Sequence, residues 1–153
     1  MRIPGITCSL LCALLVAACD GDPIGPEDLA GHYTLVSSGE DGQQRELLRA
    51  SESCDEWLVF GTLDLAEDAS YSLVLELEND CTRGGGGVTE EERTSAGTFH
   101  VSGLTLTLAA ESGTLFDEIG GFLRAGAVEL IVPDLAAAGD LTLVFEQVIF
   151  IAE

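Results

Sequence analysis

The feature that most constrains the fold is an alternation of apolar side chains on both sides of a short polar segment, residues 67–70. Leucine occupies every second position before the segment, at Leu63 and Leu65. Tyrosine or leucine occupies every second position after it, from Tyr71 to Leu77. Successive side chains of a strand point to opposite faces, so this pattern predicts two half-buried strands joined by a tight turn.

The same alternation recurs at residues 98–108 and 127–145, which predicts consecutive antiparallel strands with one apolar face. We expect strands near residues 29–36, 45–50, 57–66, 70–78, 93–101, 104–108, within 122–132, and 141–151; a partner piece of the seventh strand at residues 114–119 is left open. Residues 83–92, four glycines followed by three glutamates, are expected to form a long loop. The predicted fold is all-β: an antiparallel up-and-down meander closing into a roughly eight-stranded barrel, because closure removes exposed edges. An open β-sandwich is the alternative.

The charge of the chain limits its partners. The sequence has 27 acidic and 6 basic side chains, for a formal net charge of −21. Nucleic-acid binding depends on basic side chains that displace counterions from phosphate, so no nucleic-acid partner is expected. Apolar residues make up 46% of the chain and recur at strand spacing, which is enough to bury a core.

Residues 1–18 have the features of a secretory signal peptide. Arg2 precedes an apolar segment of about 11 residues, too short to span roughly 30 Å of hydrocarbon. The segment ends in Leu15-Val16-Ala17-Ala18-Cys19, which resembles the lipobox of bacterial lipoproteins. The resemblance implies that Cys19 becomes the acylated first residue of the mature protein and anchors it to a membrane of the cell envelope. The alternative is a plain secreted protein with an unmodified Cys19.

The mature chain then divides into two parts. Residues 19–28 are polar and contain two prolines, which predicts a semi-rigid tether. Residues 29–153 form the predicted barrel domain. A protein partner in the envelope is left open.

Two cysteines remain after the signal peptide and Cys19 are set aside, and we expect Cys54 and Cys81 to form a disulfide. A hairpin turning near residues 67–68 places opposite each other residues whose numbers add up to about 135, as those of Cys54 and Cys81 do. The crosslink would stabilise the fold by roughly 3–4 kcal/mol in the loop-entropy model. Metal ligation by this pair is the weaker interpretation, because no histidine lies nearby in the sequence.

A second resemblance concerns the domain. Gly31-His32-Tyr33 opens the first predicted strand and is similar to the G-x-W motif that opens lipocalins; residues 29–151 resemble small lipocalin-like lipoproteins of bacterial envelopes. The resemblance implies a barrel that holds a small hydrophobic ligand. The alternative is a filled barrel with a structural or interaction role, and an interior cavity distinguishes the two.

The alternation predicts which side chains would face that interior. We expect Leu65, Val101, Leu104, Val128 and Leu143 on the inward face. The candidate ligand-binding residues on the same face are Tyr33, Leu63, Tyr71, Leu73, Leu75, Phe99, Leu106, Leu130 and Phe145. Tyr33 or Tyr71 would supply any polar contact, because the other side chains are apolar.

Catalysis has no local signature in this sequence. His32 and His100 occupy the polar face of their strands, which predicts solvated histidines. No G-x-S-x-G, H-E-x-x-H or P-loop motif is present, so we expect a non-enzymatic protein without catalytic residues, metal or cofactor. Asp64, Glu67 and Asp68 cluster at one turn, but they lack the EF-hand spacing, and a solvated turn is the better interpretation.

Overall fold

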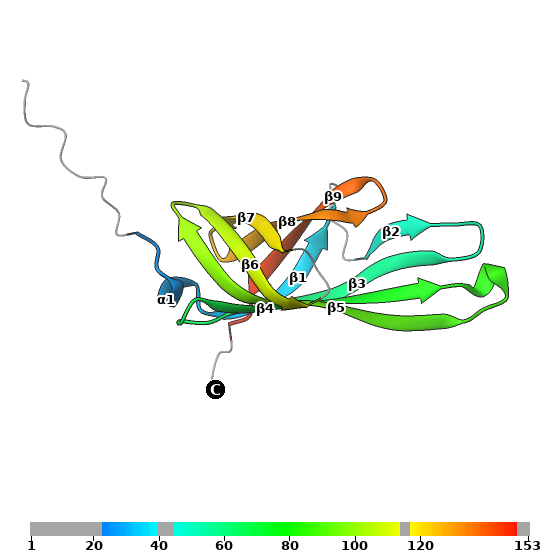
Figure 1. The fold of residues 1–153 in the computed structure, drawn as a ribbon, viewed down its shortest axis with the longest axis horizontal. Coiled ribbons are helices and arrows are strands. Elements are labelled where there is room, and N and C mark those ends of the chain that lie inside the picture. Colours follow the sequence, from blue (N-terminus) through cyan, green and yellow to red (C-terminus); the bar gives the residue numbers. More distant parts are fainter. Residues whose placement is uncertain (1–22, 40–44, 114–116, 150–153) are drawn as a thin grey trace, which may run out of the picture.

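The computed structural model describes residues 23–39, 45–113 and 117–149. It confirms the predicted class: a closed eight-stranded antiparallel β-barrel with one additional strand (Figure 1). The predicted signal peptide and Cys19 lie outside the described residues.

One helical turn and nine strands make up the described part of the chain. They are α1 (Pro26–Leu29), β1 (Gly31–Ser38), β2 (Glu46–Ala50), β3 (Asp55–Leu65), β4 (Ser70–Asp80), β5 (Val88–Ser102), β6 (Thr105–Gly113), β7 (Glu118–Arg124), β8 (Ala127–Ala136) and β9 (Gly139–Gln147). A short 3₁₀ turn, η1 (Thr82–Gly84), follows β4. None of the helices in the described ranges is long and apolar enough to cross a membrane.

Strand β1 closes the barrel. From β3 to β9 each strand pairs with the next in sequence, and β1 pairs with β9 on one side and with β3 on the other. Tyr33 lies opposite both Leu63 and Gln147 at this seam. Strand β2 pairs with the opposite end of β3, beyond the closure, so it is the additional strand.

Two predicted boundaries are wrong. Residues 122–132, within which the seventh strand was expected, contain the turn between β7 and β8, where Gly126 adopts a φ of +74°; β7 begins at Glu118, within the partner piece that was left open. The three glutamates expected in a loop belong to β5, which begins at Val88 and pairs with β4 as far as Asp80. The glycine run before them instead makes a compact turn, in which the N–H of Gly86 donates to the Cys81 carbonyl at 3.1 Å.

The barrel core consists of the inward side chains of its strands, chiefly leucines. Most of the predicted inward residues are buried, and Val101 is partly buried against them. Leu104 is the exception, with 63% of its surface exposed. It lies in the two-residue turn with Gly103, whose φ is +61°, so β6 resumes the alternation only at Leu106.

Strands β3, β4 and β5 continue beyond the barrel and form, with β2, a four-stranded extension that we call the arm (residues 45–60 and 76–93). The arm tip lies at the opposite end of the long axis from α1 (Figure 1). A disulfide between Cys54 and Cys81 joins β3 to β4 at that tip, as predicted.

The α1 end of the barrel is held to the core. Ile24 and Leu29 pack against the core, and the Tyr33 hydroxyl donates to the Leu29 carbonyl at 2.7 Å. Among the described residues, packed contacts therefore begin at Ile24, within the segment expected to be a semi-rigid tether.

Candidate functional site

The nine candidate ligand-binding residues come together inside the barrel. Each is at most 5% exposed, and all belong to one buried cluster; they are Tyr33, Leu63, Tyr71, Leu73, Leu75, Phe99, Leu106, Leu130 and Phe145. The strand alternation therefore placed them on the correct face.

The two hydroxyl groups expected to contact a ligand are already engaged within the protein. The Tyr71 hydroxyl lies 2.7 Å from the Ser95 hydroxyl, and both side chains are buried. The Tyr33 hydroxyl donates to the backbone of Leu29. Burial raises the pKa of Tyr33 and of Tyr71, and the hydrogen bond with Ser95 partly offsets the rise for Tyr71. Both phenols are therefore held neutral in apolar surroundings.

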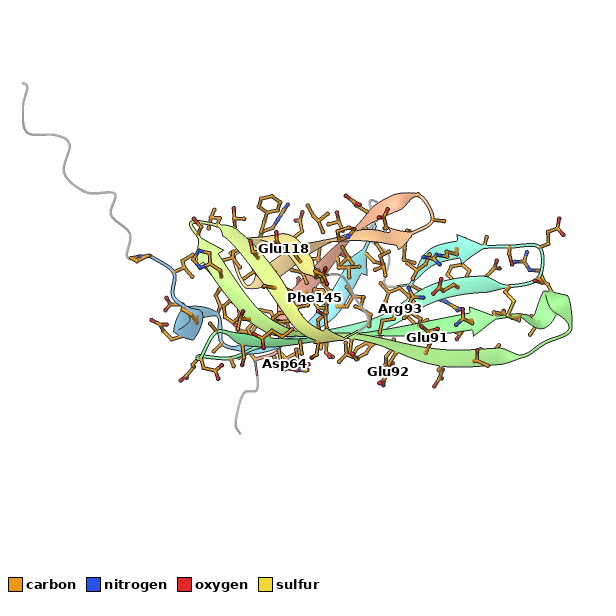
Figure 2. The ribbon with its side chains drawn as sticks, in the orientation of Figure 1. Asp64, Glu91, Glu92, Arg93, Glu118 and Phe145 are labelled. Atoms are coloured by element: carbon orange, nitrogen blue, oxygen red, sulfur yellow. A yellow bond between two sulfur atoms is a disulfide. The ribbon has the colours of Figure 1, made fainter. Side chains whose placement is uncertain are left out.

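The interior is closely packed around Phe145, which is labelled inside the barrel in Figure 2. Gly61 on β3 faces this ring, and a Cβ added to Gly61 would lie 3.0 Å from Leu75 Cδ2 and 3.4 Å from Phe145 Cε1. Such contacts are at or below van der Waals separation. An additional methyl group here would require the neighbouring side chains to shift by a few tenths of an ångström.

The cysteine prediction is confirmed in its register. Between Leu65 and Phe60 the β3–β4 pairing follows one register, and an irregularity between Leu58 and Phe60 shifts it by one residue toward the arm tip. The shift brings Cys54 opposite Cys81, where they are bonded. The thiolate pair required for metal ligation does not exist in this oxidised form.

The histidines and the turn carboxylates lie on the outer surface. His32 Nδ1 is 2.6 Å from Asp64 Oδ1 across the β1–β3 seam, and His100 is exposed on β5. Asp68 accepts hydrogen bonds from the Ser70 amide at 3.0 Å and the Ser70 hydroxyl at 2.6 Å, which lower the pKa of Asp68. Within residues 23–39, 45–113 and 117–149, no three metal-ligating side chains are grouped to hold an ion.

Comparison with known proteins gives no relative. No protein-family model, known protein or solved structure matches the chain. Its function must therefore be inferred from the arrangement of its own residues.

The sequence interpretation overlooked the arm, where most of the arginines lie. Every arginine among the described residues pairs with a carboxylate, and five of the pairs involve arm residues: Arg45–Glu78, Arg49–Glu56, Arg83–Asp55, Arg93–Glu56 and Arg93–Glu91. The sixth pair, Arg124–Glu129, lies on the barrel. Glu56 is only 9% exposed, and its two guanidinium partners offset the cost of burying its carboxylate.

The outer face of the arm is acidic. Glu76 lies opposite Glu92, and Glu78 lies opposite Glu90, so β4 and β5 carry two pairs of like charges side by side. Arg45 pairs with Glu78 and stacks 4.6 Å above the Trp57 ring. Glu76, Glu90 and Glu92 have no hydrogen-bond or ion-pair partner in the described part of the chain. Like charges directly opposite one another are destabilising, so the fold does not require this arrangement.

A groove of about 770 Å³ lies between β2 and the β8–β9 turn, and the core residues Leu48 and Leu141 form part of its lining. Leu47, Leu48 and the alanines 136–138 provide its apolar lining, and Arg49 and Asp140 add opposite charges. The Ala137 amide donates to the Leu48 carbonyl at 2.7 Å and fixes β2 beside this turn. The sequence signal for the groove is the small-residue run Ala136-Ala137-Ala138-Gly139, which lies between the strands predicted within residues 122–132 and at residues 141–151.

Proposed function

We propose that this chain is a lipid-anchored lipoprotein of the bacterial cell envelope that acts without catalysis, by contact with another macromolecule through its arm. The barrel serves as a filled scaffold. This is the second of the two sequence interpretations. Binding of a small hydrophobic ligand inside the barrel remains the rival prediction.

The observation that favours a filled barrel over a ligand-binding barrel is that both tyrosine hydroxyls already have hydrogen-bond partners within the protein. Tyr33 and Tyr71 were the only polar groups that the inward face offered to a ligand, and both are hydrogen-bonded within the protein. A ligand would have to displace these partners in a region already packed around Phe145 and Gly61. Leaving a buried polar group unpaired costs about 1–3 kcal/mol, which weighs against a ligand there.

The geometry of the proposed anchor supports contact through the arm. Cys19 precedes Ile24, the first of the described residues that packs on the core, by five residues, which reach at most about 17 Å when fully extended. An acylated Cys19 would therefore keep the α1 end close to the bilayer. The arm lies at the other end of the long axis (Figure 1), where it would be directed toward a partner.

Fractionation of cells that produce variants of the full chain tests the anchor. Cys19→Ser is expected to move the protein from the membrane fraction to the soluble fraction, because the acylated side chain is lost. Cys12→Ser, which removes a cysteine from the same segment but keeps Cys19, is the matched control and should remain membrane-bound. A Cys19→Ser protein that stays as firmly bound as the control would disprove the anchor.

An apolar fluorescent probe tests the filled interior separately. The wild-type protein should show no saturable binding. Leu75→Ala, which removes a fully buried side chain, should create a cavity that admits a small apolar molecule. Saturable binding of the probe to the wild-type protein, together with its loss in the Leu75→Trp variant, would instead support a ligand inside the barrel.

A further inference from the structure

The arm has an open edge along the first part of β5. Strand β6 pairs with β5 only from Ser95 onward, so residues 88–93 have β4 as their only neighbouring strand in the described part of the chain. Figure 1 shows this part of β5 along the outer margin of the arm. An edge of this kind is a template to which a further strand can be added.

The hydrogen-bond register identifies which backbone groups are open. The Phe99 amide donates to the Ala69 carbonyl at 2.8 Å, and the Cys81 amide donates to the Gly87 carbonyl at 3.0 Å. Both contacts involve odd-numbered positions on the β5 side, and the β4–β5 register between them has no shift. In an antiparallel pair the bonded positions alternate, so the even-numbered residues direct their N–H and C=O groups away from β4. In the open stretch these residues are Val88, Glu90 and Glu92.

The side chains at the same positions determine the charge that an added strand would meet. Glu90 and Glu92 point to the outer face of the arm, where Glu78 and Glu76 lie opposite them on β4. Figure 2 shows Glu92 on the opposite side of the arm from Arg93. An added strand would place alternate side chains beside Glu90 and Glu92, at cross-strand distance.

A second copy of the chain is a poor occupant of this edge. Pairing of two β5 edges would bring the glutamates of one copy next to those of the other, and each copy carries a formal net charge of −21. Like charges opposite one another are destabilising, and charged residues at an edge protect it from self-association. An extended segment with a cation at every second position would satisfy both the backbone groups and the carboxylates.

We propose that the β5 edge, residues 88–93, is a docking site for an extended cationic segment of a protein partner, which adds to the arm as an antiparallel or parallel strand. The inference rests on the proposed function, contact with a macromolecule through the arm. It adds the site of that contact and the charge of the partner segment. Backbone hydrogen bonds would provide the affinity, and Glu90 and Glu92, with Glu76 and Glu78 behind them, would select for Lys or Arg.

The test uses the full chain in detergent and three synthetic peptides of eight residues. The first alternates Lys with Thr. The second replaces each Lys with Glu. The third keeps the Lys–Thr sequence but carries N-methyl groups on alternate amides of its bonding edge. The first peptide should bind saturably and weaken as salt increases, because salt screens charge pairs. It should also slow hydrogen exchange at the amides of Glu90 and Glu92.

Two protein variants separate the effect of the glutamates at the β5 edge from the effect of the overall negative charge of the protein. Glu90→Gln with Glu92→Gln should weaken binding of the first peptide roughly tenfold, because two cross-strand ion pairs are lost. Glu118→Gln with Glu146→Gln removes the same number of exposed carboxylates from the barrel strands β7 and β9, and it should bind as the wild type does.

Three results would overturn the inference: no binding of the first peptide, equal binding of the N-methylated peptide, or equal loss in both double variants. In the first case the glutamates would serve only to protect the edge. None of these outcomes depends on Cys19, so failure here is distinguishable from failure of the anchor in the fractionation experiment.

Discussion

Tyr33 and Tyr71 are the two titratable residues whose pKa burial raises in the described part of the chain. They are the only tyrosines in the sequence, and both are 4% exposed. Each ring fills part of the core while its hydroxyl reaches a single partner, Ser95 or the Leu29 carbonyl. Buried tyrosines usually find such a partner, because an unpaired hydroxyl in an apolar region is costly.

The raised tyrosine pKa values predict a loss of stability at alkaline pH. In the unfolded chain tyrosine ionises near pH 10, whereas burial raises the pKa of Tyr33 and Tyr71 in the folded state. The folded state therefore retains protons that the unfolded state releases. The stabilisation is complete below about pH 10 and is lost as the pH rises toward the folded values, at up to about 1.4 kcal/mol per pH unit for each group.

Urea unfolding at about pH 8 and about pH 10.5 measures this loss. Tyr71→Phe should show a smaller difference between the two conditions than the wild type, because one titrating group is gone while the ring remains. Tyrosinate absorbance of the folded protein should rise only above the ordinary tyrosine range. Normal titration of both phenols in the folded protein would contradict the prediction.

At the scale of elements, two glycines in strands have opposite surroundings. A Cβ at Gly97 on β5 would lie 2.1 Å from the Ala109 carbonyl oxygen, where an irregularity in the β5–β6 pairing brings the backbones close together. A Cβ at Gly120 on β7 would meet nothing within 4 Å. The first glycine is therefore required by packing, and the second is not.

Gly97→Ala should lower the free energy of unfolding by about 1–3 kcal/mol, the usual cost of forcing extra volume into a packed site. Gly120→Ala is the matched control and should be neutral or slightly stabilising, because alanine restricts the unfolded chain. Urea unfolding of both variants provides the comparison. Equal changes in the free energy of unfolding for the two variants would show that β5 and β6 do not approach each other closely at Gly97.

The disulfide should stabilise the arm more than the barrel, because it joins β3 and β4 at the arm tip. Replacing Cys54 and Cys81 together with alanine should cost roughly 3–4 kcal/mol in the loop-entropy model, as expected from the sequence. Hydrogen exchange should accelerate first at the amides of residues 76–80 and later at those of residues 71–75. Uniform acceleration along β4 would show that the crosslink supports the whole barrel.

Strand alternation predicted the elements whose two faces differ and missed those whose faces are alike. The β3–β4 hairpin, its turn and its disulfide follow from leucines that point inward and polar residues that point outward. The Glu90–Glu92 run gave no alternation, because both faces of the arm contact water there. Strand β7 was obscured by Gly120 and Gly121; the second of these has no space for a side chain, since a Cβ would lie 2.4 Å from the Glu129 carbonyl.

The charge of the whole molecule sets its response to salt. Five described arginines pair with carboxylates, but the sequence contains 27 acidic residues, so most carboxylates repel one another without compensation. Exposed ion pairs contribute at most about 1 kcal/mol each, and salt weakens them. Salt also screens the self-repulsion of a chain with a charge of −21, which acts against the folded state.

Melting temperature should therefore rise when sodium chloride is increased from low to physiological concentration, by roughly 3 °C for each kcal/mol gained. Sucrose at the same osmolality controls for general exclusion effects. A fall in melting temperature with salt would mean that the arginine pairs of the arm outweigh the repulsion among the carboxylates.

The position of β1 in the barrel also determines the order in which the strands can pair during folding. Strand β1 is the first of the described strands to emerge during synthesis, yet one of its neighbours is β9, where Tyr33 lies opposite Gln147. Until β9 has been made, β1 and β8 each lack a partner along one edge. Pairing β9 with β1 then closes a loop that contains almost the whole domain, which costs chain entropy. Proteins dominated by pairings between strands far apart in the sequence fold slowly, and they expose unpaired strand edges until folding is complete. The ring that leaves the finished barrel without open edges is thus completed last, and the incomplete chain depends on its many carboxylates to keep those edges from pairing with other chains.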